Sequence, residues 1–178
     1  GDLKSLSYEW YRDSVSTNSA LQHPVIRILI DADGNLNTTN DRGGLVFERA
    51  YNGGAVPTDT WVLDDVFAYN GGQGAKVWNF GLGLGTAFGG YSKTLSDWVN
   101  GAVSSAIGAN SLVIGLSLGV GSGWGPFKGA VDTVTYGFGT TATTTNFEVT
   151  VVPIPEPGAV LLGLLGLSGL TAARRRLS

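Results

Sequence analysis

The stretch SLSYEWYR, residues 5–12, places Leu6, Tyr8 and Trp10 at every second position. Successive side chains of a strand point to opposite faces, so these three side chains share one face of an extended chain. A period of two over this length predicts a strand with one face in the core. We therefore expect a β-sheet protein that buries Trp10.

Similar short runs rich in β-branched and aromatic residues follow, separated by clusters of Gly, Asn and Asp. Between residues 92 and 101, Thr94 and Asp97 have the spacing of a helix capping box, which predicts one or two helical turns. The TTATTT run at 140–145 is expected to be a linker or a loop. About eight strands without long helices between them predict an all-β, antiparallel jelly-roll-type β-sandwich. Beyond the first, the expected strands are 25–30, 45–51, 60–69, 76–80, 111–120, 130–138 and 146–152.

The composition excludes several classes of protein. The 178 residues include 28 glycines but no cysteine, so disulfides and thiolate metal sites are excluded. Residues 1–152 carry eight Lys and Arg against thirteen Asp and Glu, a net charge of −5, which argues against nucleic acid as a partner. Methionine is also absent, even at position 1, and we expect that an amino-terminal export signal has been removed.

Residues 153–178 differ from the body of the chain. Pro155, Glu156 and Pro157 precede an uncharged, Leu- and Gly-rich run at 158–173, and Arg174, Arg175 and Arg176 follow it. As a helix this run would span about 24 Å, short of a hydrocarbon core of about 30 Å, which suits a temporary transmembrane helix. Because basic flanks stay cytoplasmic, the preceding domain is expected outside. An ordinary tail anchor or a buried core helix is the alternative.

The three parts of this tail, in this order and at this spacing, resemble the PEP-CTERM sorting tail. In that family the tail is recognised by an exosortase, a membrane-embedded transpeptidase of exopolysaccharide-producing Gram-negative bacteria. The resemblance implies a β-sandwich domain at 1–152 and a sorting tail at 153–178, cut near Pro155–Pro157. It also implies passage through the inner membrane to the cell surface or extracellular matrix.

The body of the chain also carries a resemblance, at SYEWYRDS (residues 7–14), TDTWVLDD (residues 58–65) and FKGAVDTVTYGF (residues 127–138). These segments look like the extracellular jelly-roll domains often found ahead of this tail, and the last resembles the closing strand of concanavalin-like modules. The resemblance implies a fold without assigning a site.

Residues suited to catalysis are few. His23, the single histidine, precedes a proline at the start of an expected strand, where we expect it to face solvent. No G-x-S-x-G motif accompanies it. Two carboxylates for glycoside hydrolysis could come from Glu9 with Asp13, or from Asp64 with Asp65, but neighbours on a strand point to opposite faces. We therefore expect a protein that is not an enzyme, with a glycan-cleaving enzyme as the least favoured alternative.

Calcium is the candidate cofactor. The run DADGN contains Asp31, Asp33 and Asn35 at spacings found in oxygen-ligand loops, with Asp41 nearby. The full pattern would require a carboxylate at the position of Leu29. A metal site at Asp31, Asp33 and Asn35 and a polar hairpin turn without metal both stay open.

Trp124 stands in the glycine-rich run GSGWGPF, outside any apolar periodicity, and is the candidate for an exposed contact with a glycan. Taken together, these features predict a non-enzymatic, exported surface or matrix protein that exosortase processes. The alternative is a carbohydrate-binding module for the producer's own exopolysaccharide, for which calcium is the candidate cofactor.

Overall fold

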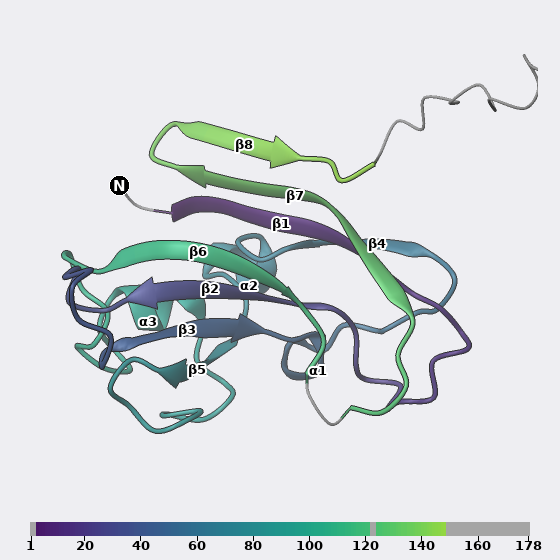
Figure 1. The fold of residues 1–178 in the computed structure, drawn as a ribbon, viewed down its shortest axis with the longest axis horizontal. Helices are drawn as coiled ribbons and strands as arrows, with labels where there is room; N and C mark the ends of the chain where they lie inside the picture. Colours follow the sequence, from purple (N-terminus) through teal and green to yellow (C-terminus); the bar gives the residue numbers. More distant parts are fainter. Residues whose placement is uncertain (1–2, 122–123, 149–178) are drawn as a thin grey trace, which may run out of the picture. The chain divides into compact units, whose positions relative to one another are not determined.

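The chain forms two antiparallel β-sheets packed face to face. The computed structural model describes residues 3–121 and 124–148, and Figure 1 shows the two sheets as layers. The prediction of an antiparallel β-sandwich is confirmed. In spatial order, the first sheet contains β4 (Trp61–Asp65), β1 (Leu3–Arg12), β7 (Gly129–Phe138) and β8 (Thr141–Thr145).

The second sheet contributes a row of isoleucines to the core. Ile26, Ile28 and Ile30 alternate along one strand and are all buried, as a strand with one face inward requires. The cluster of buried side chains also includes residues of the first sheet, so the core lies between the layers. In spatial order, the second sheet contains β5 (Val77–Gly81), β3 (Arg42–Phe47), β2 (Val25–Asp31) and β6 (Leu112–Gly119).

Strand β1 lies in the interior of the first sheet, between β4 and β7. Its residues Leu6, Tyr8 and Trp10 are at most 1 % exposed, which confirms the alternation predicted from the sequence. Burying a large side chain of this kind stabilises the folded state by about 1.5–3 kcal/mol. The hydroxyl of Tyr8 donates to the carbonyl of Pro24, 2.8 Å away, just before β2.

Within the described residues, three short helices lie outside the sheets: α1 (Arg49–Asn52), α2 (Tyr69–Gly72) and α3 (Leu95–Val99). At α3 the hydroxyl of Thr94 accepts the Asp97 amide at 3.1 Å, and the Asp97 carboxylate accepts the Thr94 amide at 2.8 Å. This capping box confirms the predicted helix. None of the helices in the described ranges is long and apolar enough to cross a membrane.

A buried carboxylate joins the two layers. Asp64, on β4 of the first sheet, is 1 % exposed and accepts hydrogen bonds from Trp10, Arg49 and Tyr69. Arg49 comes two residues after the end of β3, so its ion pair with Asp64 ties the second sheet to the first. Burial, reinforced by Asp64, raises the pKa of Tyr69. We refer to these four residues as the Asp64 cluster.

His23 is buried, so the prediction that it faces solvent was wrong. It is 1 % exposed and packs against Trp10, with 4.7 Å between ring centroids. Its Nε2 accepts the backbone N–H of Arg49 at 2.9 Å. Because the ring is removed from water, the pKa of His23 falls from 6.5 to about 4, so the imidazole is neutral at pH 7.

Two of the predicted strands end several residues earlier than expected. The strand expected at 60–69 stops at Asp65, before α2 begins at Tyr69. The strand expected at 45–51 ends at Phe47, because the Arg49 amide bonds to His23 and the chain turns into α1. The TTATTT run, expected to be a linker or loop, pairs with β7 as β8. Residues 146–148 lie outside any strand. The rest of the strand expected at 146–152 lies outside the described residues, as do the PEP motif, the expected transmembrane helix and Arg174–Arg176.

The neutral state of His23 predicts a pH-dependent stability. His23 binds a proton less tightly in the folded state than in the unfolded state. The contribution of its neutral imidazole to the free energy of unfolding is therefore complete above about pH 6.5 and is lost as the pH falls towards 4. We expect the free energy of unfolding, measured in urea, to fall by about 2 kcal/mol between pH 7.5 and pH 5.

His23→Gln is the control, because it removes the titrating group and keeps a hydrogen-bond acceptor. Its stability should be nearly constant over the same interval. The depressed pKa values of Asp13, Asp41 and Asp97 place their effects at lower pH. Equal pH dependence in both proteins would rule out this role for His23.

Candidate metal centre

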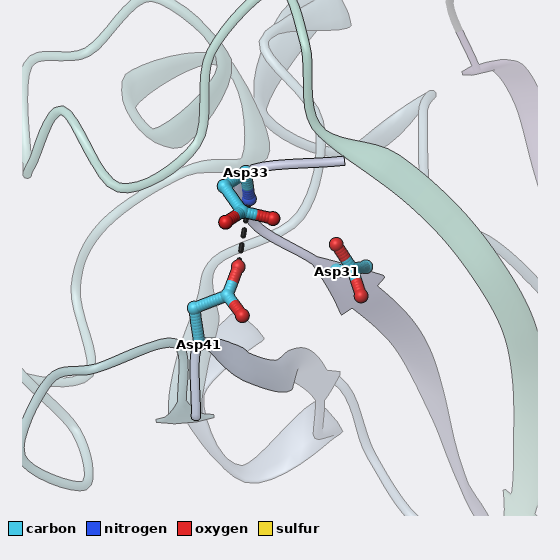
Figure 2. A group of neighbouring side chains, drawn as sticks. All are labelled: Asp31, Asp33 and Asp41. Atoms are coloured by element: carbon cyan, nitrogen blue, oxygen red, sulfur yellow. Dashed lines mark hydrogen bonds between the residues drawn. The ribbon is translucent and has the colours of Figure 1, made fainter. Parts of the chain in front are cut away.

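Three aspartates meet at the loop between β2 and β3 (Figure 2). Asp31 ends β2 and is fully buried, Asp33 is exposed in the loop, and Asp41 directly precedes β3. One carboxylate oxygen from each lies within 4.8 Å of the others. Oxygen atoms at this spacing are suited to a hard divalent cation such as calcium.

The β2–β3 hairpin brings these residues together. Asp31 pairs with Arg42 across the strands, which places Asp41 level with the start of the loop. The backbone amide of Asp33 donates to Asp41 Oδ2 at 2.7 Å, the bond drawn in Figure 2. The loop between Asp33 and Asp41 needs a glycine at position 34, because the φ of Gly34 is +75° and a Cβ there would overlap the carbonyl of Asn110.

Two of the carboxylate oxygens lack a hydrogen-bond donor. Oδ2 of Asp31 accepts from Nε of Arg42 at 2.9 Å, but its Oδ1 is buried and unpaired. Oδ1 of Asp41 is also buried and unpaired. Leaving a buried acceptor unsatisfied costs about 1–3 kcal/mol, and more for a charged group. A bound cation would satisfy both oxygens at once.

The hydrogen bonds in the loop also favour the ionised form of Asp41. The Asp33 amide is the main cause that lowers the pKa of Asp41, so this carboxylate carries its charge at neutral pH. Only the Arg42 guanidinium forms an ion pair with the three aspartates in the described part of the chain. The negative charge of the loop therefore exceeds its positive charge.

The sequence predicted Asp31, Asp33 and Asn35 as ligands, and the structure brings Asp31 and Asp33 together with Asp41 instead. The Oδ1 of Asn35 accepts the amide of Asn37 at 3.2 Å, and the Asn35 amide donates to Asp33 at 2.7 Å. Asn35 therefore closes the turn. The place of Asp41 opposite Asp31 follows from the pairing of β2 with β3. The sequence did not predict it, because the expected strand began at Leu45, three residues after the true start of β3.

The residues present fit a calcium ion in part. Calcium takes six to eight oxygen ligands at about 2.3–2.6 Å, from carboxylates, carbonyls and water. Asp31 and Asp41 would each supply an unpaired oxygen, and the exposed Asp33 would supply a third. Water would complete the shell, since the loop opens to solvent at Asp33.

Trp10 is buried as predicted, and two other tryptophans lie nearer the surface. Trp124, the candidate glycan contact, is half-buried and its indole lies against Gly121. Trp61 on β4 is 49 % exposed, the largest value of the five, and its ring lies 5.7 Å from that of Tyr11. Trp61 is exposed because it lies on the outer face of β4, which is an edge strand. The sequence pattern did not show that this strand lies at an edge.

Three of the four carboxylates considered for glycoside hydrolysis are engaged in contacts within the fold. Asp64 is held in the Asp64 cluster, while Asp65 is exposed and accepts the amide of Phe67 at 3.0 Å. Asp13 pairs with Lys128 at 2.6 Å. Each of these aspartates therefore has a structural partner.

No protein family, curated protein or solved structure matches this chain.

We predict that calcium stabilises the protein. At a concentration a hundred times the Kd, the gain is about 2.7 kcal/mol, which raises the Tm by about 5–10 °C for a chain of this size. Asp31→Asn and Asp41→Asn should abolish the increase, measured by thermal unfolding in calcium and in chelator. Asp65→Asn, an exposed aspartate on β4, should retain it. An increase of the same size in all four proteins would exclude this site.

Proposed function

We propose that the chain is a non-enzymatic, exported surface or matrix protein, sorted and processed by exosortase through its tail. The observation that carries the proposal is the order Pro155-Glu156-Pro157, an uncharged apolar run and Arg174–Arg176. The prolines favour an extended segment accessible to a processing enzyme. The short apolar run favours a removable anchor, with the arginines inside and the β-sandwich outside.

The β-sandwich supports an extracellular role. The chain crosses from one sheet to the other four times, at the connections β1–β2, β3–β4, β4–β5 and β6–β7. Repeated crossing between sheets is common to jelly rolls, and we propose this type for the domain. Because the sequence has no cysteine, its stability outside the cell would come from the core, the Asp64 cluster and calcium at the loop.

The non-enzymatic part of the proposal rests on the use of the acidic side chains. Both oxygens of Asp64 receive hydrogen bonds from neighbouring side chains, so this carboxylate is held in the structure. His23 bonds to a backbone amide in the core. The residues best suited to catalysis thus serve the fold.

The processing step can be tested by intact mass spectrometry. The full chain is expressed in an exopolysaccharide-producing host with exosortase and in the same host lacking it. We expect the extracellular protein to end near residues 155–157 only when exosortase is present. Replacing Pro155, Glu156 and Pro157 by alanine should keep the whole tail on the membrane fraction. Extracellular protein that retains Arg174–Arg176 would overturn the proposal.

A second candidate, the carbohydrate-binding module, is favoured by three aromatic residues at the outer face of the second sheet. Tyr51 and Tyr91 stack with centroids 4.4 Å apart, and Trp78 meets Tyr91 edge-on at 6.0 Å. Tyr91 is 45 % exposed. The apolar faces of a sugar ring stack on such rings, which also provide polar edges. We call Tyr51, Trp78 and Tyr91 the aromatic cluster.

Polar groups beside the aromatic cluster could bind sugar hydroxyls. Glu48 accepts the indole N–H of Trp78 at 3.2 Å, and burial raises the pKa of Glu48. Arg27 shares this outer face, because it pairs with Val46, which in turn pairs with Trp78. A carboxylate and a guanidinium near stacked rings are an arrangement typical of glycan recognition sites.

Affinity electrophoresis distinguishes this candidate from a purely structural protein. We expect gels cast with the producer's exopolysaccharide to retard the full chain, and Trp78→Ala and Tyr91→Ala to remove the retardation. Trp61→Ala is the matched control, since it removes an exposed tryptophan elsewhere. Trp124→Ala tests the residue indicated by the sequence. Loss of retardation in Trp124→Ala alone would assign the contact to Trp124, and no retardation of the wild type would exclude glycan binding.

A further inference from the structure

The candidate metal centre and the aromatic cluster belong to the same face of the second sheet. The isoleucines of β2 face the core, so Arg27, Leu29 and Asp31 of this strand belong to the outer face. Residues directly opposite each other in paired strands point to the same face. Arg27 therefore shares a row with Trp78, which it reaches through Val46 of β3. Asp31 lies four residues along β2 from Arg27, which is a distance of about 13 Å.

The row between the two sites is apolar and shallow. It consists of Phe80, Gly44, Leu29 and Gly115, one residue from each strand of the sheet. The ring of Phe80 lies against Gly44, since a Cβ there would be 3.0 Å from it. The two glycines leave no side chain on either side of Leu29, and Leu29 and Phe80 are both half-buried. A ligand that lies along the face would cross an aromatic ring and an aliphatic side chain.

A calcium ion at the candidate metal centre would keep positions for the oxygen atoms of a ligand. The three aspartates offer one oxygen each, and the oxygens from Asp31 and Asp41 that lack a hydrogen-bond donor are buried. Calcium takes six to eight oxygen ligands, and neutral oxygens are suitable as well as carboxylates. Asp33 is exposed, so the remaining positions open to solvent. Hydroxyl groups of a sugar could take the place of water there.

The charges at the two ends of the face balance when calcium is bound. At the aromatic end, Arg27 and Glu48 carry opposite charges and interact electrostatically. At the metal end, Arg42 pairs with one of the three aspartates at 2.9 Å. A divalent cation would balance the other two. These groups therefore leave no surplus charge for an ionic ligand.

We propose that this face binds one neutral oligosaccharide chain across both sites. Two neighbouring hydroxyl oxygens of one sugar bind the calcium ion, and a later sugar ring in the same chain stacks on the aromatic cluster. The apolar faces of the sugars between them pack on Phe80 and Leu29. Because the bound face has no surplus charge and the protein carries a net charge of −3, an acidic glycan is disfavoured. This inference rests on glycan binding, the second candidate function.

The test measures affinity electrophoresis of the full chain in two forms of the producer's exopolysaccharide. One form is native, and in the other the carboxyl groups of acidic sugars are reduced to alcohols. In calcium, we expect both forms to retard the wild type equally. Retardation by the native form alone would overturn the assignment of a neutral ligand. No retardation by either form would exclude glycan binding itself and the inference with it.

The role of calcium is tested in the carboxyl-reduced form, which does not bind the ion through carboxylates of its own. Chelator should weaken binding at least about tenfold, because one of two linked contacts is lost. Asp41→Asn should bind as weakly in calcium as the wild type does in chelator, whereas Asp65→Asn should bind normally. Retardation that chelator leaves unchanged would overturn the inference and leave glycan binding at the aromatic cluster in place.

Leu29→Lys tests whether one chain spans both sites. It places a hydrated cation between the two contacts and replaces neither a metal ligand nor an aromatic ring. We expect binding to weaken at least about tenfold, while calcium still raises the Tm, which also verifies that the variant folds. Leu63→Lys is the matched control, because Leu63 is 59 % exposed on β4 of the other sheet. Equal binding by Leu29→Lys and the wild type would overturn the inference.

The length of the ligand provides a test that needs no variant. Oligosaccharides from partial hydrolysis of the carboxyl-reduced exopolysaccharide are separated by size and used as competitors in the same gels. Chains long enough to cover about 13 Å should compete at least about tenfold better than single sugars at equal molar concentration. Equal competition by single sugars would show that the two sites do not share a chain and would overturn the inference.

Discussion

The contact between Asp64 and Arg49 is the constraint on which the sandwich depends. Apolar side chains from two sheets attract each other without direction, whereas this ion pair fixes where one layer lies on the other. The indole of Trp10 completes it from β1, with the Arg49 guanidinium 5.4 Å above the ring. Removal of one partner from a buried ion pair costs about 3–5 kcal/mol, because the remaining charge is left without compensation. His23 extends the arrangement by holding the Arg49 amide.

The two ends of the sandwich are therefore built differently. Near the end of β1 and the start of β2, the Asp64 cluster and His23 fill the space between the sheets with aromatic rings and buried polar groups, of which Nδ1 of His23 has no hydrogen-bond partner. At the other end, the loop between β2 and β3 lies next to a cavity of about 740 Å³ that residues of both sheets line. Ser111 lines the cavity, and its hydroxyl donates to the carbonyl of Ala32 between Asp31 and Asp33, at 2.6 Å. A cation held in the loop would thus stiffen one wall of the cavity.

The sequence predicted the parts of the fold that follow from local pattern. Alternation identified β1 and its buried face, and the Thr94–Asp97 spacing identified α3. The failures came where a distant partner decides. His23 looks like a solvent-facing residue until Trp10 covers it, and TTATTT becomes a strand only because β7 offers an edge. In the candidate metal centre, two aspartates were visible as neighbours in sequence, while the role of Asp41 required the register of the hairpin.

The position of β1 in the first sheet has a consequence for how the chain reaches this structure. β1 is the first strand, yet its neighbours are β4 and β7, and the latter begins at Gly129. The central pairing of this sheet therefore cannot form until nearly the whole domain is available. Contacts so distant in sequence slow folding, because the loop entropy is lost before the contacts are gained. A chain that is made from its amino terminus would therefore hold β1 without either of its neighbours until β4 followed, and without its longest pairing until β7 was complete.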